Sequence, residues 1–280
     1  MVFLAVRGMS SMAHLKELVR RPVLRKEASP RPDPRAPILA IGTSHLAAVQ
    51  GAARQNRGAA RIASAQLRDT RYRGALVRAP DGAPSLSWRL AEDVGERSRE
   101  LIVSLIGGNK HNILGLLNHP RPFDFVLPEE PDLPFTPGAE CVPVDLVADS
   151  LAKRAANELD LLRMLRKATT VPMVHMESPP PNPSVDHIRR HPGVFKDRID
   201  ELGVAPLHLR YKLWRVHSSV VRTACAEAGI GFVPVPREAM DAQSMLLEPA
   251  WADDPTHGST WYGALVLQQI LDAAGGRKTA

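Results

Sequence analysis

The chain has 280 residues, of which 44% are hydrophobic and 24% charged, a composition typical of globular proteins. It has no uninterrupted apolar run long enough to cross a membrane, which predicts a soluble protein. The formal net charge of +6 would permit contact with nucleic acid. The charge is scattered, however, and aromatic residues make up only 5%, so we expect a solvated surface and no nucleic-acid partner.

The two cysteines and the N-terminus bear on compartment and cofactors. Cys141 and Cys225 lie far apart and outside any metal-binding or redox spacing, although a single disulfide between them stays possible. We therefore expect no metal and no other cofactor. The apolar stretch at residues 1–6 is shorter than the core of a signal peptide and has no basic residues before it, which favours a cytoplasmic protein.

The N-terminal part of the chain predicts a basic, proline-containing arm over residues 1–36, followed by one α/β domain over residues 37–280. Residues 38–41 are apolar and end at Gly42, which predicts a buried parallel strand, and residues 46–55 have the pattern of a helix. Ser44 falls in the turn between them. It either caps that helix or acts as a nucleophile, because ligands bind where the strands of open α/β sheets end.

The remaining chain alternates between apolar strands and amphipathic helices. Further strands are predicted at residues 59–67, 101–106, 171–176 and 230–235, and helices at 91–99, 144–167, 207–228 and 261–274. Residues 68–88 are expected to be irregular, with a short strand at 75–77. Proline-rich insertions near residues 118–143 and 179–206 are expected to form part of a cover, the second with a short helix at 194–202. The alternation predicts a parallel sheet with helices on both faces.

Three side chains near the predicted strand ends have the chemistry to activate a serine. Asp254 precedes His257 by three residues, a spacing that lets the carboxylate reach the imidazole. Asn109 follows two glycines, so its amide could donate a hydrogen bond to a substrate oxygen. Each also has a structural alternative, because Asp254 or His257 could cap the last helix and Asn109 could occupy a left-handed turn.

Taken in order, the motifs in the chain resemble those of the SGNH/GDSL hydrolase family: Gly42-Thr43-Ser44, Gly107-Gly108-Asn109 and Asp254-Pro255-Thr256-His257. The resemblance spans about residues 37–274 and implies a three-layer α/β/α flavodoxin-like sandwich with a five-stranded parallel sheet. It also implies hydrolysis of an acyl ester. Ser44 would be the nucleophile and His257 the general base, oriented by Asp254. Asn109 and the Ser44 backbone N–H would form the oxyanion hole.

The chain departs from the family pattern at three places. Thr43 replaces the acidic residue that usually precedes the serine, and Lys110 replaces the acid that usually follows Asn109. The family's glycine after the second strand has no clear counterpart, since residues 68–70 occupy the expected turn. Gly74 is one candidate for this third oxyanion donor. Loss of one donor would cost about 3 kcal/mol of transition-state stabilisation, which leaves a degenerate or very selective enzyme open.

Polar residues next to the motifs suggest a substrate class. Lys110, His111, Asn112 and Glu177 are expected to line the rim of the pocket, where they would suit a carbohydrate O-acetyl ester, or else to form a solvated loop. We therefore predict a serine esterase or deacylase acting on a small-molecule or glycan acyl ester. The alternative is a non-catalytic module of the same fold that binds a glycan or acylated ligand.

Overall fold

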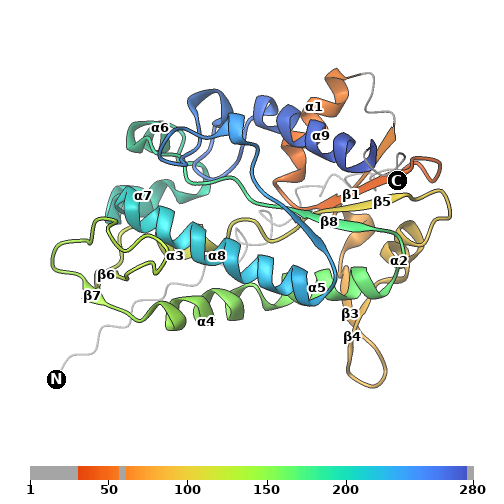
Figure 1. Ribbon diagram of the computed structural model, residues 1–280, viewed down its shortest axis with the longest axis horizontal. Coiled ribbons are helices and arrows are strands. Elements are labelled where there is room, and N and C mark those ends of the chain that lie inside the picture. The colour runs from red at the N-terminus through yellow and green to blue at the C-terminus, as the bar shows by residue number, and fades with distance from the viewer. Residues whose placement is uncertain (1–30, 57–60, 276–280) are drawn as a thin grey trace, which may run out of the picture.

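The computed structural model describes residues 31–56 and 61–275. Its core is a five-stranded parallel sheet in the order β2-β1-β5-β8-β9 (Figure 1). The strands are β1 (Ile38–Gly42), β2 (Ile62–Gln66), β5 (Leu101–Leu105), β8 (Met173–Met176) and β9 (Gly231–Val233). In chain order this is the 2-1-3-4-5 arrangement of flavodoxin-like folds, so the predicted fold class is confirmed.

Helices cover both faces of this sheet, as Figure 1 shows with the sheet seen nearly edge-on. Two helices pack on one face: α1 (Leu46–Gln55) and α9 (Thr260–Gly275). The other face is covered by α2 (Trp88–Val94), α5 (Ala156–Lys167) and the C-terminal half of α8 (Leu207–Glu227). Alternate residues of β1 enter the two cores, Ile38 on the α1 side and Leu39 on the α5 side. Because both faces are buried, the strand is continuously apolar.

The segment after β2 contains more regular structure than we predicted. A 3-10 helix at Thr70–Tyr72 is followed by a hairpin of β3 (Leu76–Arg78) and β4 (Pro84–Leu86) in place of the single strand expected at 75–77. The next helix, α2, begins at Trp88 and ends at Val94, earlier than the predicted 91–99. The hairpin turns at Gly82, whose φ of +82° favours glycine.

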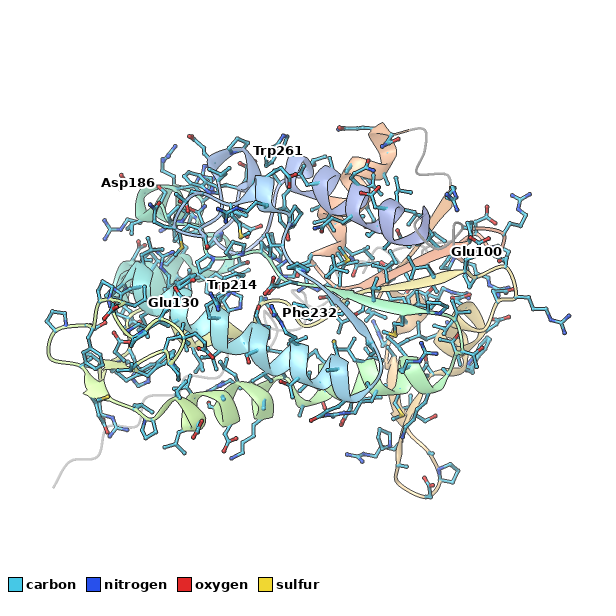
Figure 2. The ribbon with its side chains drawn as sticks, viewed as in Figure 1. Glu100, Glu130, Asp186, Trp214, Phe232 and Trp261 are labelled. Carbon is cyan, nitrogen blue, oxygen red and sulfur yellow. The ribbon has the colours of Figure 1, made fainter. Side chains whose placement is uncertain are left out.

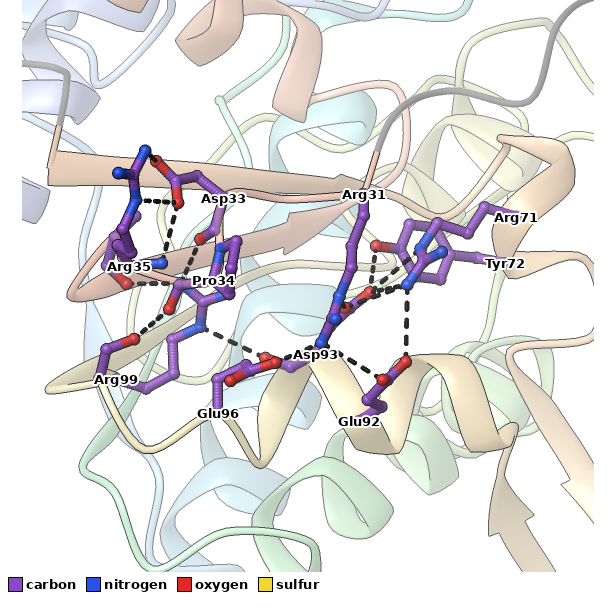
Figure 3. Close-up of polar contacts among 12 residues, drawn as sticks. Arg31, Asp33, Pro34, Arg35, Arg71, Tyr72, Glu92, Asp93, Glu96 and Arg99 are labelled. Atoms are coloured by element: carbon purple, nitrogen blue, oxygen red, sulfur yellow. Dashed lines mark hydrogen bonds and ion pairs between the residues drawn. The ribbon is translucent and has the colours of Figure 1, made fainter.

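A cluster of ion pairs attaches residues 31–36 to α2 (Figure 3). Asp93 is fully buried and accepts hydrogen bonds from Arg31, Arg71 and the Tyr72 hydroxyl. Arg99 donates to the carbonyl oxygens of Asp33 and Ala36. The end of the predicted arm is therefore fixed to the domain, and its residues 1–30 lie outside the described residues.

Two predicted boundaries were wrong in the part of the chain that forms α3, α4 and α5. The helix predicted at 144–167 is two helices, α4 (Val144–Arg154) and α5, separated at Ala155. The polar turn predicted at 107–112 instead contains the start of a helix, α3 (Lys110–Gly115). A Cβ at Gly115 would lie 2.3 Å from Leu213 Cδ1, so glycine allows α3 to pack closely on α8.

Both proline-rich insertions are fastened to α8 by buried cations. The first contains β6 (Phe123–Asp124) and β7 (Glu140–Cys141), and the second contains α6 (Val185–Arg190), a 3-10 helix (Gly193–Phe195) and α7 (Lys196–Leu202). The Lys212 ammonium donates to Asp124 in the first. The Arg210 guanidinium donates to the carbonyl oxygens of Asn182 and Pro183 in the second, and burial lowers its pKa to about 10.

Short 3-10 helices at Arg237–Ala239 and Glu248–Ala250 lead from β9 toward α9. Cys141 is exposed and Cys225 is buried, and both are free thiols, so the possible disulfide is not formed. Burial raises the pKa of the Cys225 thiol to about 12, which makes it unreactive at neutral pH. Within residues 31–56 and 61–275, no helix has the length and apolar character needed to span a bilayer.

Candidate active site

Asp254 and His257 form a preorganised pair in the loop before α9. The His257 Nδ1 lies 2.9 Å from each Asp254 carboxylate oxygen. Oδ1 also accepts the backbone N–H groups of Thr256, at 2.7 Å, and of His257, at 3.0 Å. Because of this turn, a spacing of three residues brings the Asp254 carboxylate to the His257 ring. Neither residue caps α9, because the Ser259 hydroxyl accepts the Tyr262 N–H instead.

The carboxylate of Asp254 is held in its charged form. Burial alone would raise its pKa, but the hydrogen bonds from the His257 ring and from the Thr256 and His257 backbone outweigh burial and lower the pKa to about 2. An ionised Asp254 accepts a hydrogen bond from the Nδ1–H of His257, which favours the tautomer with a free lone pair on Nε2. Nε2 is buried and has no hydrogen-bond partner among the described residues, which suits it to accept a proton from a nearby hydroxyl.

Ser44 lies in the turn between β1 and α1, as predicted, and shares a cleft of about 580 Å³ with Asp254 and His257. It does not cap α1. The cap position is His45, which makes no side-chain cap bond, and the Ser44 hydroxyl has no hydrogen bond to any residue that the structure describes. The structure thus brings the three residues to one cleft without a hydrogen bond between Ser44 Oγ and His257 Nε2.

Asn109 lies beyond the end of β5, the strand beside β1. It occupies the cap position of α3 with a φ of −128°, and its amide makes no cap bond. The left-handed position belongs to Gly107, at +78°, so the left-handed alternative for Asn109 was wrong. Asn109 is not among the residues that line the Ser44 cleft, and its role as an oxyanion donor stays a prediction.

The end of β2 contributes Gln66 and Arg68 to the cleft, whereas Gly74 does not line it. The Gln66 side chain donates to the Thr43 carbonyl at 3.0 Å and so fixes the turn that carries Ser44. Gly74 lies just before β3, and its φ of +70° is a backbone conformation that favours glycine. The local conformation therefore explains why a glycine occurs there. The sequence places residues 68–70 in the turn after the second strand but indicates no role for Gln66 or Arg68.

The four residues expected at the rim lie elsewhere. Lys110 pairs with Glu158 of α5 at 2.7 Å. His111 and Asn112 are buried in the first turns of α3, where the His111 ring packs against His217 of α8. The Glu177 carboxylate accepts the Val235 N–H. The physical reason is that α3 begins at residue 110 and turns Lys110 toward α5 and His111 toward α8, whereas Glu177 is held by the Val235 N–H at the end of β8.

His45 and Gly108 lie beside the candidate base, although the sequence alone indicates no role in the chemistry for either residue. The buried His45 ring lies 4.9 Å from the His257 ring, centroid to centroid. Burial, followed by the proximity of His257, lowers the pKa of His45 to about 3, so the ring is neutral at physiological pH. A Cβ at Gly108 would lie 2.7 Å from His45 and 2.9 Å from Ser178. The only sequence signal was the position of His45 directly after Ser44.

We expect Gly108→Ala to reduce stability and any turnover that depends on His257. The new methyl group would displace His45, whose ring packs on His257, at a cost of about 1–3 kcal/mol for overpacking. Thermal unfolding and kcat/KM would be measured for G108A, H45A and the double variant. Because H45A removes the His45 contact and leaves the Ser178 contact, the double variant should lose less stability than the sum of the two single losses. Additive losses would show that the methyl group clashes with something other than His45.

No group of three or more His, Cys, Asp or Glu side chains in the described part of the chain is arranged to hold a metal ion.

Comparison with known proteins gave structural matches only. No family model and no curated protein matches the chain. Three solved hydrolases resemble it in structure. A GDSL-like lipase from Bacteroides thetaiotaomicron is 14% identical with a TM-score of 0.40, covering 85% of this chain and 89% of its own. A provisionally named acylhydrolase from Bacteroides fragilis is 12% identical with a TM-score of 0.46, covering 89% and 91%.

The third, an α/β-hydrolase enzyme from the metagenome of Lake Arreo in Spain, is 14% identical with a TM-score of 0.35, covering 87% of this chain and 96% of its own. Likeness at these values does not extend to the chemistry of a site. The function is therefore argued from the residues of the cleft.

Proposed function

We propose that the chain is a serine ester hydrolase of the SGNH/GDSL type, in which Ser44 attacks an acyl ester. The observation that carries this proposal is the hydrogen bonding of the His257 ring. Its Nδ1 is bonded to a carboxylate whose pKa is about 2, and its buried Nε2 has no partner in the described ranges, in a cleft shared with Ser44. This is the arrangement that general-base catalysis needs.

In the proposed mechanism, Ser44 Oγ bonds to the ester carbonyl carbon and its proton passes to His257 Nε2. The resulting imidazolium is stabilised by the Asp254 carboxylate. Collapse of the tetrahedral intermediate breaks the bond to the alcohol, which leaves with the proton from His257. Water, deprotonated by His257, then attacks the acyl-enzyme and releases the acid.

The oxyanion of the intermediate would be stabilised by hydrogen-bond donors beside Ser44. We assign this role to the Ser44 backbone N–H and the Asn109 amide, neither of which donates to another residue within the described part of the chain. Each such donor typically contributes about 3–4 kcal/mol. The polar rim that suggested a carbohydrate O-acetyl ester does not line the cleft, so the substrate class must be argued from other residues.

A fluorophosphonate probe tests the proposal, because it labels only an activated serine. We expect the wild-type protein to be labelled at Ser44, as located by peptide mass spectrometry. Labelling should be lost in Ser44→Ala and strongly reduced in His257→Ala, which lacks the base. Ser219→Ala removes an exposed serine on α8 and is the matched control, expected to label normally. A folded wild-type protein that resists the probe would instead favour the non-catalytic ligand-binding module.

A further inference from the structure

Arg68 is a cation of the Ser44 cleft that the proposed mechanism does not use. It follows β2 directly and lines the cleft together with Ser44, Asp254 and His257. Its side chain is exposed, so its charged end is accessible from solvent. The small side chains Ala47 and Ala48 also line this cleft.

Two arginines near Arg68 in the chain, Arg61 and Arg71, are paired with carboxylates, whereas Arg68 and Arg73 form no ion pair with a described residue. Arg61 lies 3.7 Å from Glu100, and Arg71 lies 3.1 Å from Asp93. Glu100, labelled in Figure 2, directly precedes β5. Arg68 forms no ion pair with any residue in ranges 31–56 and 61–275. An unpaired guanidinium presents five N–H donors in a planar fork that matches a carboxylate or phosphate group.

The acidic residues of the cleft do not substitute for such a partner. The Asp254 carboxylate is occupied by His257 and the turn that holds it. The Asp253 side chain is 96% exposed, and its Oδ1 lies 4.0 Å from Nδ1 of His191 in the second insertion. Arg68 also influences the electrostatics of the site. Its positive charge adds to the effects of burial and of His257 that lower the pKa of His45.

We propose that Arg68 binds a carboxylate or phosphate group carried by the substrate, so that the preferred substrates are anionic acyl esters. This inference rests on the proposed ester hydrolase function and specifies its substrate class. The anion would be held in the ground state as well as in the transition state. Loss of Arg68 should therefore act mainly through KM, and its effect should weaken as salt is raised.

Matched pairs of esters test whether the anion sits in the acyl or the alcohol part. For the acyl part, mono-4-nitrophenyl glutarate is compared with 4-nitrophenyl pentanoate, which has the same chain length without the carboxylate. For the alcohol part, 4-acetoxybenzoate is compared with its methyl ester. The readout is the ratio of kcat/KM for the anionic ester to that for its neutral partner, with spontaneous hydrolysis measured separately and subtracted.

We expect Arg68→Gln to lower this ratio about tenfold in at least one pair, mostly through KM, the size expected for a charged hydrogen bond at a partly solvated site. Arg68→Lys should retain part of the preference because it keeps the charge but loses the fork. Arg73→Gln is the matched control: it removes an exposed arginine of the same segment that does not line the cleft. An unchanged ratio for R68Q in both pairs overturns the inference.

A binding measurement keeps the inference separate from the proposed function. Calorimetry on Ser44→Ala would give the affinities for glutarate and for inorganic phosphate, which also shows which anion is favoured. The double variant S44A/R68Q should bind the favoured anion about tenfold more weakly, again the size of one charged hydrogen bond. Equal affinities for the two proteins would contradict a role of Arg68 in anion binding. Wild-type turnover in S44A would instead contradict the proposed function.

Discussion

Ser44→Ala is expected to lower kcat for a short-chain 4-nitrophenyl ester by at least about 10⁴-fold, the scale seen when a catalytic nucleophile is removed. KM should change little, because the hydroxyl reacts in the transition state and contributes little to substrate binding. The protein should stay folded. The Ser44 hydroxyl has no hydrogen bond in the described structure, so its loss should change the free energy of unfolding by no more than about 0.5 kcal/mol.

The measurement is steady-state turnover, with thermal unfolding recorded on the same samples. Thr43→Ala is the matched control, because it removes a hydroxyl from the preceding residue of the same turn. It should retain turnover within a fewfold of wild type. Turnover by a folded S44A variant at the wild-type rate would exclude Ser44 as the nucleophile, whatever the geometry of Asp254 and His257.

Local sequence patterns sufficed where the structure is decided by neighbouring residues. The helix predicted at 46–55 has those bounds in the structure. The apolar strand before it and the turn at Ser44 together determine the residue at which the helix begins. The Asp254–His257 pair was also predictable. Both residues belong to one turn, whose backbone N–H groups bind the same carboxylate, so no distant part of the chain is needed to form it.

Contacts between distant segments could not be predicted in this way. The polar residues His111 and Asn112 suggested a solvated turn, yet both are buried because α3 packs on α8, about a hundred residues later in the chain. The prolines predicted insertions near 118–143 and 179–206, but they carry no information on where these pack. The structure gives the insertions no part in lining the Ser44 cleft.

The second insertion instead supports the loop that carries the candidate base. The His187 Nε2 lies 2.8 Å from the Ala252 carbonyl oxygen, and the His187 ring packs on Trp251. Trp251 and Ala252 are themselves part of the cleft wall. The insertions were predicted to cover the site, but the contact observed is that of His187 with the loop that carries His257. A sequence pattern could not show this, because the pairing joins residues 65 positions apart.

Lys212→Ala is expected to lower the free energy of unfolding by about 3–5 kcal/mol, the cost of leaving one charge of a buried pair without its partner. Lys212 is 1% exposed and Asp124 is fully buried. The Lys212 ammonium uses all three of its donors, on Asp124 Oδ1 at 3.0 Å, Phe125 O at 2.9 Å and Pro134 O at 2.8 Å. Its loss would detach the first insertion from α8. Chemical denaturation measures the effect.

A control and the pH dependence separate this charge pair from packing alone. Lys196→Ala breaks an exposed pair with Asp200 and should cost about 0.5 kcal/mol or less. Burial alone would raise the pKa of Asp124, but hydrogen bonds from Thr136, Phe125 and Lys212 outweigh it and lower the pKa below 3.8.

Because the folded-state pKa of Asp124 is the lower one, the stability that its ionised form contributes is present above pH 3.8 and is lost as the pH falls through the folded value. Lys212→Ala should therefore flatten the loss of stability in acid as well as reduce stability at neutral pH. The double variant Asp124→Asn/Lys212→Met, which removes both charges, should be more stable than Lys212→Ala. If it is not, the ammonium acts mainly by bonding the two backbone carbonyls, and the charge on Asp124 contributes little.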